Sequence, residues 1–254
     1  MRRSRKLARR EVLAVGLAST AGVLAGCSRP MPPTYGNLLR MGDNLTYAAH
    51  RLLLPGQTLV KEYPRSAISN FPAVGTADPG DPAVSRVSEA YRAMQRRGFA
   101  DWTLSVEGAV ARPGSFSLAD LKAMPSRTQI TKHACEEGWT AIGEWTGVPL
   151  SRVLDAVGLK PEARFVSYVG IDGNGESIDL LDALHPQTIL AYAMNDKPLP
   201  VANGAPLRVR VERQLGYKMA KYIRRIELIS EFSQVGLGKG SYWADQGYEW
   251  YAGI

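Results

Sequence analysis

Hydrophobic and polar residues follow regular patterns from about residue 100 onward. Trp102, Leu104 and Val106 alternate with polar residues, which predicts a strand with one buried face. Apolar residues at helical spacing predict a short amphipathic helix that ends at Gly158, and these residues are Leu150, Val153, Leu154 and Val157. Further strands are predicted over residues 128–133, 164–171, 207–211 and 223–228. Strands mixed with short helices, without regular βαβ alternation, indicate an α+β domain.

Two local signals predict where a helix begins and where the chain turns. Ser117 followed by Asp120 is typical of a capping box, so a short helix is expected there and should stop at Pro125. Asn195-Asp196 lies between two short apolar runs, which favours a hairpin turn.

Residues 27–98 have a different character, because they are rich in Pro, Gly, Ser and Arg. Only a short helix, around residues 45–54, is expected in them. We interpret residues 27–98 as a tether and a wrapping segment, and residues 99–254 as the main domain.

The first 26 residues resemble a signal peptide. Six basic residues precede an uncharged stretch over residues 12–26, which is too short to cross a bilayer comfortably. The pair Arg9-Arg10 resembles a twin-arginine signal, and Leu24-Ala25-Gly26-Cys27 resembles the lipobox of bacterial lipoproteins. We therefore expect lipidation of Cys27 and a location on the periplasmic or cell-surface side of a membrane. An uncleaved signal anchor is the alternative.

The net charge of +7 depends largely on this N-terminal segment. Residues 1–26 hold six of the 31 basic and one of the 24 acidic residues, which leaves 25 and 23, or +2, for the rest. This balance gives no argument for nucleic acid binding. No haem-attachment, dinucleotide-binding or phosphate-loop motif is present in the sequence either.

The chain has two cysteines, and lipidation of Cys27 would leave Cys135 without a disulfide partner. A lone cysteine is either an inert buried thiol or a reactive group. One reactive role is that of a soft metal ligand. A second is that of a nucleophile with His133 or His185 as its base.

Two blocks of sequence resemble the sulfite oxidase family, in particular its exported bacterial branch, which includes periplasmic protein-methionine-sulfoxide reductases. The first runs from His133 to Trp139, as His-Ala-Cys-Glu-Glu-Gly-Trp, and continues with Trp145-Thr-Gly-Val-Pro-Leu. The second begins at His185-Pro-Gln-Thr and continues through Asn203-Gly-Ala-Pro-Leu-Arg to Gly216-Tyr-Lys-Met-Ala-Lys. The resemblance covers about residues 102–230.

The resemblance implies a mixed-sheet molybdopterin-binding fold, a Mo-molybdopterin cofactor, and Cys135 as both metal ligand and catalytic residue. Cofactor-binding positions implied in the same way are Asn203, Arg208, Lys218, Met219, Ala220, Lys221, Ser69, Asn70, Gly170 and His133. Gly170 stands where the sulfoxide reductases have Thr, and Pro72-Ala73 replaces Tyr-Glu. Arginines that bind substrate in sulfite oxidases have no match in this sequence.

Arg208 has an argument of its own, because it lies on the polar face of a predicted strand and carries a planar donor fork suited to phosphate. Four other arginines are interpreted as solvated strand faces: Arg210, Arg213, Arg224 and Arg225.

The function expected from the resemblance is a two-electron oxo transfer on a small sulfite-like or protein-sulfoxide substrate, in a direction that the sequence leaves open. Since no haem motif exists, electrons must pass through a separate partner, such as a cytochrome or a membrane haem protein. A non-enzymatic lipoprotein that uses the same fold to bind a ligand or partner is the alternative.

Overall fold

The computed structural model describes residues 41–254 apart from residues 55, 84, 86, 232 and 234. The chain divides into two compact units, of which the one that spans residues 32–254 contains all the described elements. The predicted signal peptide and Cys27 lie outside the described residues. No helix within them is both long and apolar enough to span a membrane.

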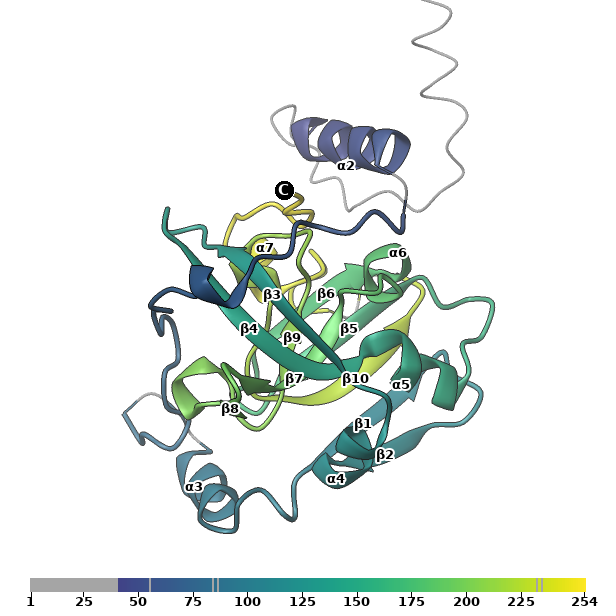
Figure 1. The fold of residues 1–254 in the computed structure, drawn as a ribbon. Coiled ribbons are helices and arrows are strands. Elements are labelled where there is room, and N and C mark those ends of the chain that lie inside the picture. The colour runs from purple at the N-terminus through teal and green to yellow at the C-terminus, as the bar shows by residue number, and fades with distance from the viewer. Residues whose placement is uncertain (1–40, 55, 84, 86, 232, 234) are drawn as a thin grey trace, which may run out of the picture. The chain divides into compact units, whose positions relative to one another are not determined.

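The first sheet contains the strands that begin and end the domain (Figure 1). Its order is β2 (Gly114–Ser117), β1 (Thr103–Gly108), β10 (Ile223–Ile229), β5 (Phe165–Gly170) and β6 (Gly175–Asp179). β1 and β10 are parallel, and the other neighbouring pairs are antiparallel. This sheet therefore joins segments more than 100 residues apart in sequence.

The second sheet carries the two blocks that resemble the sulfite oxidase family. Its order is β3 (Arg127–Ala134), β4 (Thr140–Pro149), β7 (Ile189–Met194) and β8 (Lys197–Pro198), and β9 (Arg208–Arg210) also pairs with β7. The β4–β7 ladder shifts register at Gly147, where a Cβ would lie 2.2 Å from the carbonyl oxygen of Leu190. Only glycine allows this close approach.

Apolar side chains from both sheets and from α5 (Leu150–Val157) form one buried cluster. Leu104 of β1, Leu190 of β7 and Ile226 of β10 are fully buried in it. The remaining helical segments are α2 (Met41–Leu53), η2 (Arg65–Ala67), α3 (Ser88–Arg96), α4 (Leu118–Ala123), α6 (Leu180–Ala183), η3 (Val201–Asn203), η4 (Gly216–Lys218) and α7 (Tyr242–Asp245). The predicted α+β fold with mixed sheets is confirmed.

The local predictions with a clear chemical signal are also confirmed. Ser117 and Asp120 form the expected capping box at the start of α4. Gly158 follows α5 with a φ of 70°, a conformation that favours glycine. Asn195 and Asp196 have φ values of 51° and 58°, as a two-residue hairpin turn of the mirror-image type requires.

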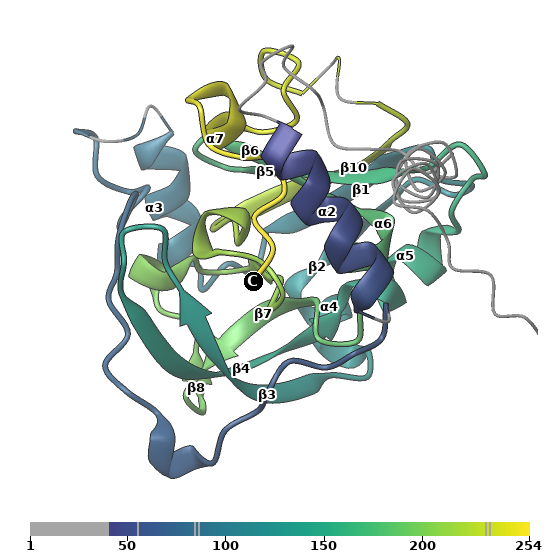
Figure 2. The ribbon, with the colours of Figure 1, turned by 90° about the horizontal axis from the view of Figure 1, so that it is seen from above.

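Described residues before 99 pack along the main domain (Figure 2). Glu62 forms a β-bridge with Thr131, and the Ser69 hydroxyl accepts a hydrogen bond from the backbone N–H of Ile142 at 2.9 Å. The buried Tyr91 hydroxyl donates to the carbonyl of Ala205 at 2.7 Å. These contacts hold the described residues before 99 against strands β3 and β4 and the loop that contains Ala205.

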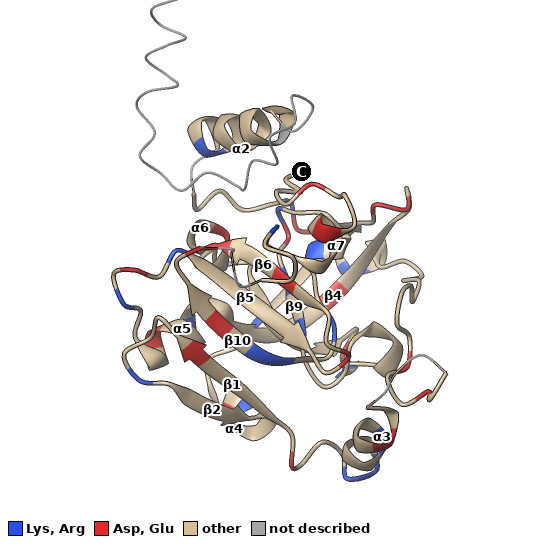
Figure 3. Cartoon of the chain, turned by 180° about the vertical axis from the view of Figure 1, so that it is seen from behind, with Lys and Arg blue, Asp and Glu red and all other residues tan. Residues whose placement is uncertain are grey.

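The interpretation of four arginines as solvated was correct for two of them. Arg224 and Arg225 of β10 are exposed, and charged residues of both signs lie along β10 and the neighbouring β1 (Figure 3). Arg210 and Arg213 are 0% and 5% exposed, so the prediction was wrong for them. Arg210 lies on β9, which is covered on both faces, and alternation along a strand indicates a solvated face only where one face is open. Arg213 lies beyond β9, and its guanidinium donates to the carbonyl of Gly56 at 3.1 Å.

Candidate functional site

A cavity of about 370 Å³ gathers residues from six segments that are far apart in the sequence. These segments are residues 71–76, the turn between β3 and β4, residues 172–176, residues 202–208, residues 216–221 and the C-terminal residues 242–248. Seven of the predicted site residues line it: His133, Cys135, Asn203, Arg208, Met219, Ala220 and Lys221. Residues of the two blocks thus meet in one place, although Cys135 and Asn203 are 68 positions apart in the sequence.

Cys135 enters the cavity from the turn that follows β3. Its backbone N–H donates to the carbonyl of Trp139 at 2.9 Å, and Gly138 closes the turn with a φ of 90°. The thiol is free and 7% exposed, and burial raises its pKa to about 11. A thiolate at this position therefore needs a positive partner, which a bound metal ion provides.

Other residues of metal-binding types line the cavity, but they are not gathered into a metal site. Among the described residues, no three His, Cys, Asp or Glu side chains are grouped so that they could hold a metal ion. A metal at Cys135 would therefore take most of its ligands from a cofactor.

Arg208 is a buried cation whose donors are only partly used. It is 6% exposed, and one Nη donates to the carbonyl of Asn203 at 3.2 Å. Its Nε is buried and has no hydrogen-bond partner among the described residues. Burial and the neighbouring Arg210 lower the pKa of Arg208, so the folded protein disfavours its charge. An anionic group in the cavity would supply the missing partner.

Lys221 also lines the cavity, but its ammonium is engaged with the wrapping segment. Its Nζ donates to the carbonyls of Val74, Thr76 and Ala202. Burial and Arg208 lower the pKa of Lys221 to about 8. Since an ammonium has three N–H donors, all of them are directed to the backbone. Lys221 thus holds residues 74–76 and Ala202 in place as part of the cavity wall.

The remaining predicted residues lie around the cavity and do not line it. Lys218 is fully buried and pairs with Glu176 at 2.8 Å. Gly170 is buried beside the site, where a Cβ would lie 2.4 Å from a carboxylate oxygen of Asp172. Ser69 and Asn70 are exposed, while the next residue, Phe71, does line the cavity.

His133 is held as a neutral ring. It lies between Phe71 and Trp139, with ring centroids 5.1 and 5.4 Å away, and its Nδ1 accepts from Arg210 at 2.9 Å. Arg210 in turn pairs with Glu212 through two hydrogen bonds of 2.9 and 2.7 Å. Burial and the two nearby guanidinium groups strongly lower the pKa of His133. Arg210 therefore orients a cavity residue, a role that the strand pattern did not predict.

The hypothesis of a cysteine nucleophile lacks a base. His133 Nδ1 already accepts from Arg210. Both ring nitrogens of His185 bond to the backbone, at Thr58 and Gln187, and this ring does not line the cavity. Neither histidine is thus arranged to deprotonate Cys135.

Aromatic and acidic residues complete the lining, and the sequence analysis did not identify them as site residues. The aromatic residues are Phe71, Trp139, Tyr217, Tyr242, Trp243 and Tyr248. The acidic residues are Glu136, Glu137, Asp172 and Glu176. Tyr242 and Tyr248 are 40% and 38% exposed, so they belong to the solvent side of the cavity. The concentration of aromatic residues after position 240 is a sequence signal that could have indicated part of this wall.

Comparisons with known proteins agree with this geometry. A family model described as "Oxidoreductase molybdopterin binding domain" matches residues 91–235. The chain is 33% identical over 231 residues to a putative protein-methionine-sulfoxide reductase subunit, YedZ1, of Azospira oryzae, covering 91% of this chain and 82% of that protein. It is 30% identical over 243 residues to the protein-methionine-sulfoxide reductase catalytic subunit MsrP of Xanthomonas axonopodis pv. citri, covering 89% and 71%.

A solved structure is similar over about half of the chain. The sulfane dehydrogenase SoxCD from Paracoccus pantotrophus matches with a TM-score of 0.50 and 26% identity. The match covers 52% of this chain and 39% of that one. It therefore compares the shared domain and leaves most of the SoxCD chain without a counterpart.

Proposed function

The chain belongs to the sulfite oxidase family of molybdopterin-dependent oxidoreductases, and from this we propose that it reduces a sulfoxide of the methionine type outside the cytoplasm. Family membership identifies an enzyme, so the non-enzymatic alternative is set aside. The observation that carries the proposal is the cavity itself, in which a free thiol and a buried, partly unpartnered arginine meet aromatic and acidic walls.

The residues present fit a molybdenum cofactor at two points. Cys135 would bind the metal, and Arg208 would bind an anionic part of the pterin with the Nε that has no partner among the described residues. Asn203, Met219 and Ala220 would complete the seat. The bound cofactor supplies the exchange of an oxo group together with two electrons.

The lining favours a neutral sulfur substrate over sulfite. Four acidic residues line the cavity with two cations, Arg208 and Lys221, and one of the four, Glu176, is already paired with the buried Lys218. The donors of Lys221 are already used by carbonyl groups, and an anionic cofactor would take Arg208. A sulfite dianion would thus meet net negative charge, whereas a sulfoxide carries none.

The aromatic side chains supply apolar surroundings for the carbon chain of such a substrate and for the thioether sulfur of its product. Thioether sulfur makes attractive contacts with aromatic rings, each worth about 0.3–1.5 kcal/mol. Trp243, Tyr242 and Tyr248 belong to the C-terminal segment, beyond the residues that the family model matches. The names of the two relatives, both protein-methionine-sulfoxide reductase subunits, support the same substrate class.

The reaction consumes two electrons and two protons, and it converts a sulfoxide into a thioether and water. Glu136 lies beside the thiol on the cavity wall, where its carboxylate accepts a hydrogen bond from Cys135 Sγ at 3.4 Å. His133 is neutral and held by Arg210, so its part is to shape the wall. Electrons arrive from a separate partner protein, as the word "subunit" in the relatives' names also suggests.

An assay in both directions tests the proposal. Natively exported protein is analysed for molybdenum and then mixed with reduced viologen dye and methionine sulfoxide, or with an oxidising dye and sulfite. We expect one molybdenum per chain and turnover with the sulfoxide alone. Cys135→Ser should lose both the metal-thiolate spectroscopic signal and turnover, since a hydroxyl is a far weaker ligand for this metal. Turnover with sulfite only would refute the proposed substrate.

Export is proposed from the N-terminal sequence and is tested separately. Arg9→Lys together with Arg10→Lys should leave the metal-loaded protein in the cytoplasm, because a cofactor inserted before export requires a route for folded proteins. Labelling with radioactive palmitate should mark the wild type and not Cys27→Ala. A labelled Cys27→Ala protein, or normal export of the double variant, would contradict these two assignments.

A further inference from the structure

We infer that α2 is a membrane-surface helix, whose exposed apolar face lies in the lipid interface beside the proposed acyl anchor. The inference rests on the proposed export and lipidation, and it adds a binding surface that the catalytic cavity does not contain.

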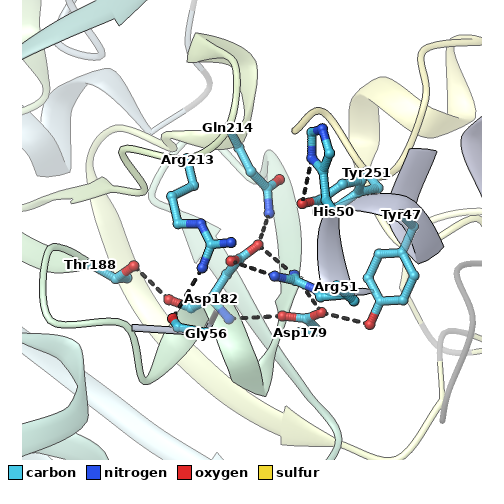
Figure 4. A network of polar contacts seen from close by, with 10 residues as sticks. All are labelled: Tyr47, His50, Arg51, Gly56, Asp179, Asp182, Thr188, Arg213, Gln214 and Tyr251. Carbon is cyan, nitrogen blue, oxygen red and sulfur yellow. Dashed lines mark hydrogen bonds and ion pairs between the residues drawn. The ribbon is translucent and has the colours of Figure 1, made fainter. Parts of the chain in front are cut away.

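The polarity of α2 is the reverse of that of an ordinary surface helix. Its inward face carries Arg51, whose side chain is 6% exposed and forms ion pairs with Asp179 at 2.7 Å and Asp182 at 2.8 Å (Figure 4). Tyr47 is 4% exposed and donates to Asp179 at 2.8 Å. The charged and aromatic face is therefore the one fixed to the domain.

The outward face carries large apolar side chains. Met41, Leu45 and Leu52 are 54%, 60% and 75% exposed. At about 100° per residue, these three positions fall within about 40° of each other, and Tyr47 and Arg51 lie about 100° or more away from their centre. A surface helix normally buries this stripe against the core.

Exposed apolar residues are concentrated in this part of the chain. Eleven large hydrophobic residues are exposed among those that the structure describes, and six of them lie within residues 41–59. Scattered apolar residues on a surface need no explanation, but a cluster of this kind indicates a contact with lipid or protein.

The position of α2 in the sequence favours lipid. Thirteen residues, 28–40, separate Cys27 from Met41. Fully extended, such a segment spans no more than about 50 Å, so an acylated Cys27 would leave α2 within reach of the bilayer surface. An amphipathic helix in that position buries its apolar face at the boundary of headgroups and acyl chains.

The ion pairs fix which way the stripe faces. Asp182 also accepts from Gln214 at 2.5 Å, and Arg51 lies over the rings of Tyr47 and Tyr251 at 5.0 and 5.1 Å (Figure 4). Turning α2 to bury its leucines against the domain would leave Asp179 and Asp182 without their cation, which is costly for buried carboxylates. The apolar face therefore stays available for lipid.

Site-specific photo-crosslinking in the full chain tests this inference. A benzophenone amino acid replaces Leu52, and the matched control carries it at Leu237, which is 80% exposed and lies outside α2. The purified acylated protein is placed in vesicles of phosphatidylethanolamine and phosphatidylglycerol at three to one. We expect lipid adducts at position 52 with a yield about tenfold above that at position 237.

A second variant removes the apolar face without touching the ion pairs. With the crosslinker moved to Leu53, Leu45→Ser together with Leu52→Ser should lower the lipid-adduct yield about tenfold. Molybdenum content and sulfoxide turnover should not change, because Tyr47 and Arg51 are intact and the cavity does not include α2.

Three results would overturn the inference: equal adduct yields at positions 52 and 237, an unchanged yield in the double variant, or adducts to a protein in native membranes with none in pure-lipid vesicles. The last result would assign the face to a membrane partner. Absence of molybdenum or turnover would refute the proposed function alone, and absence of palmitate labelling would refute the anchor alone, since each is measured separately.

Discussion

The substitution Arg208→Met should have opposite effects on fold stability and on cofactor binding. It should stabilise the protein without cofactor and weaken the retention of the cofactor. In the cofactor-free protein, Arg208 is a buried cation beside Arg210, and its Nε has no partner among the described residues. Replacement of a buried ion pair by apolar groups of similar volume is often neutral or stabilising, by about 1–4 kcal/mol, and we expect a similar gain for a buried cation that has no carboxylate partner among the described residues. We expect the melting temperature of the cofactor-free variant to rise by about 3–10 °C.

The same substitution should weaken cofactor retention. A hydrogen bond to a charged group contributes about 1.5–3 kcal/mol, so the loss of one phosphate contact corresponds to about 10-fold to 150-fold weaker binding. Protein made without cofactor synthesis gives the melting temperature, and molybdenum per chain after dialysis gives the retention. A stabilised protein that loses its metal would support both halves of the reasoning.

Arg224→Met is the matched control. It removes the same charge from an exposed position on β10 and should change neither quantity. Full molybdenum loading in Arg208→Met would refute the assignment of Arg208 to the cofactor. A clear fall in the melting temperature of the cofactor-free variant would instead show that the buried charge stabilises the fold.

Three further predictions concern other parts of the site. Arg210→Met should lower the free energy of unfolding by about 3–5 kcal/mol, because it leaves the buried Glu212 carboxylate without its cation; an effect as small as that of Arg224→Met in urea unfolding would contradict this. The folded-state pKa of Lys221, about 8, lies below the ordinary lysine value, so the unfolded chain binds the extra proton between about pH 8 and 10.5 and stability should rise with pH. The unfolding free energy of the wild type minus that of Lys221→Met should therefore increase by about 3 kcal/mol from pH 7.5 to 10.5, because only the wild type carries this group. A difference that stays constant over this range would refute the shifted pKa. Trp243→Ala should raise KM for methionine sulfoxide about 2-fold to 10-fold with molybdenum content unchanged, whereas an unchanged KM would remove this ring from the substrate wall.

Elements whose signal lies in consecutive residues could be predicted from the sequence. The strand at Leu104, the capping box at Ser117, the helix that ends at Gly158 and the hairpin at Asn195 all depend on side chains within a few positions of one another. Cys135 was found for a similar reason, since its neighbours form a compact motif. Local preference and periodicity suffice where no distant partner changes the outcome.

The tertiary structure decided which partners the buried charged residues have. Arg208 and Arg210 alternate in the same way along one strand, yet their partners differ. The Nε of Arg208 has no partner among the described residues, whereas Arg210 bonds to Glu212 and His133. Lys218 was expected at the cofactor, but Glu176, 42 residues earlier, pairs with it. A pattern within one strand cannot show which groups the other segments bring to it.

Two surfaces likewise exist only in the folded chain. The aromatic wall forms because the C-terminal residues 242–248 come to the turn after β3, more than 100 positions earlier. α2 was predicted as a helix, but the hydrophobic pattern alone would bury Leu45 and Leu52. Asp179 and Asp182, about 130 residues away, turn the opposite face of α2 toward the domain. Leaving these buried carboxylates without Arg51 would cost more free energy than leaving two leucines exposed.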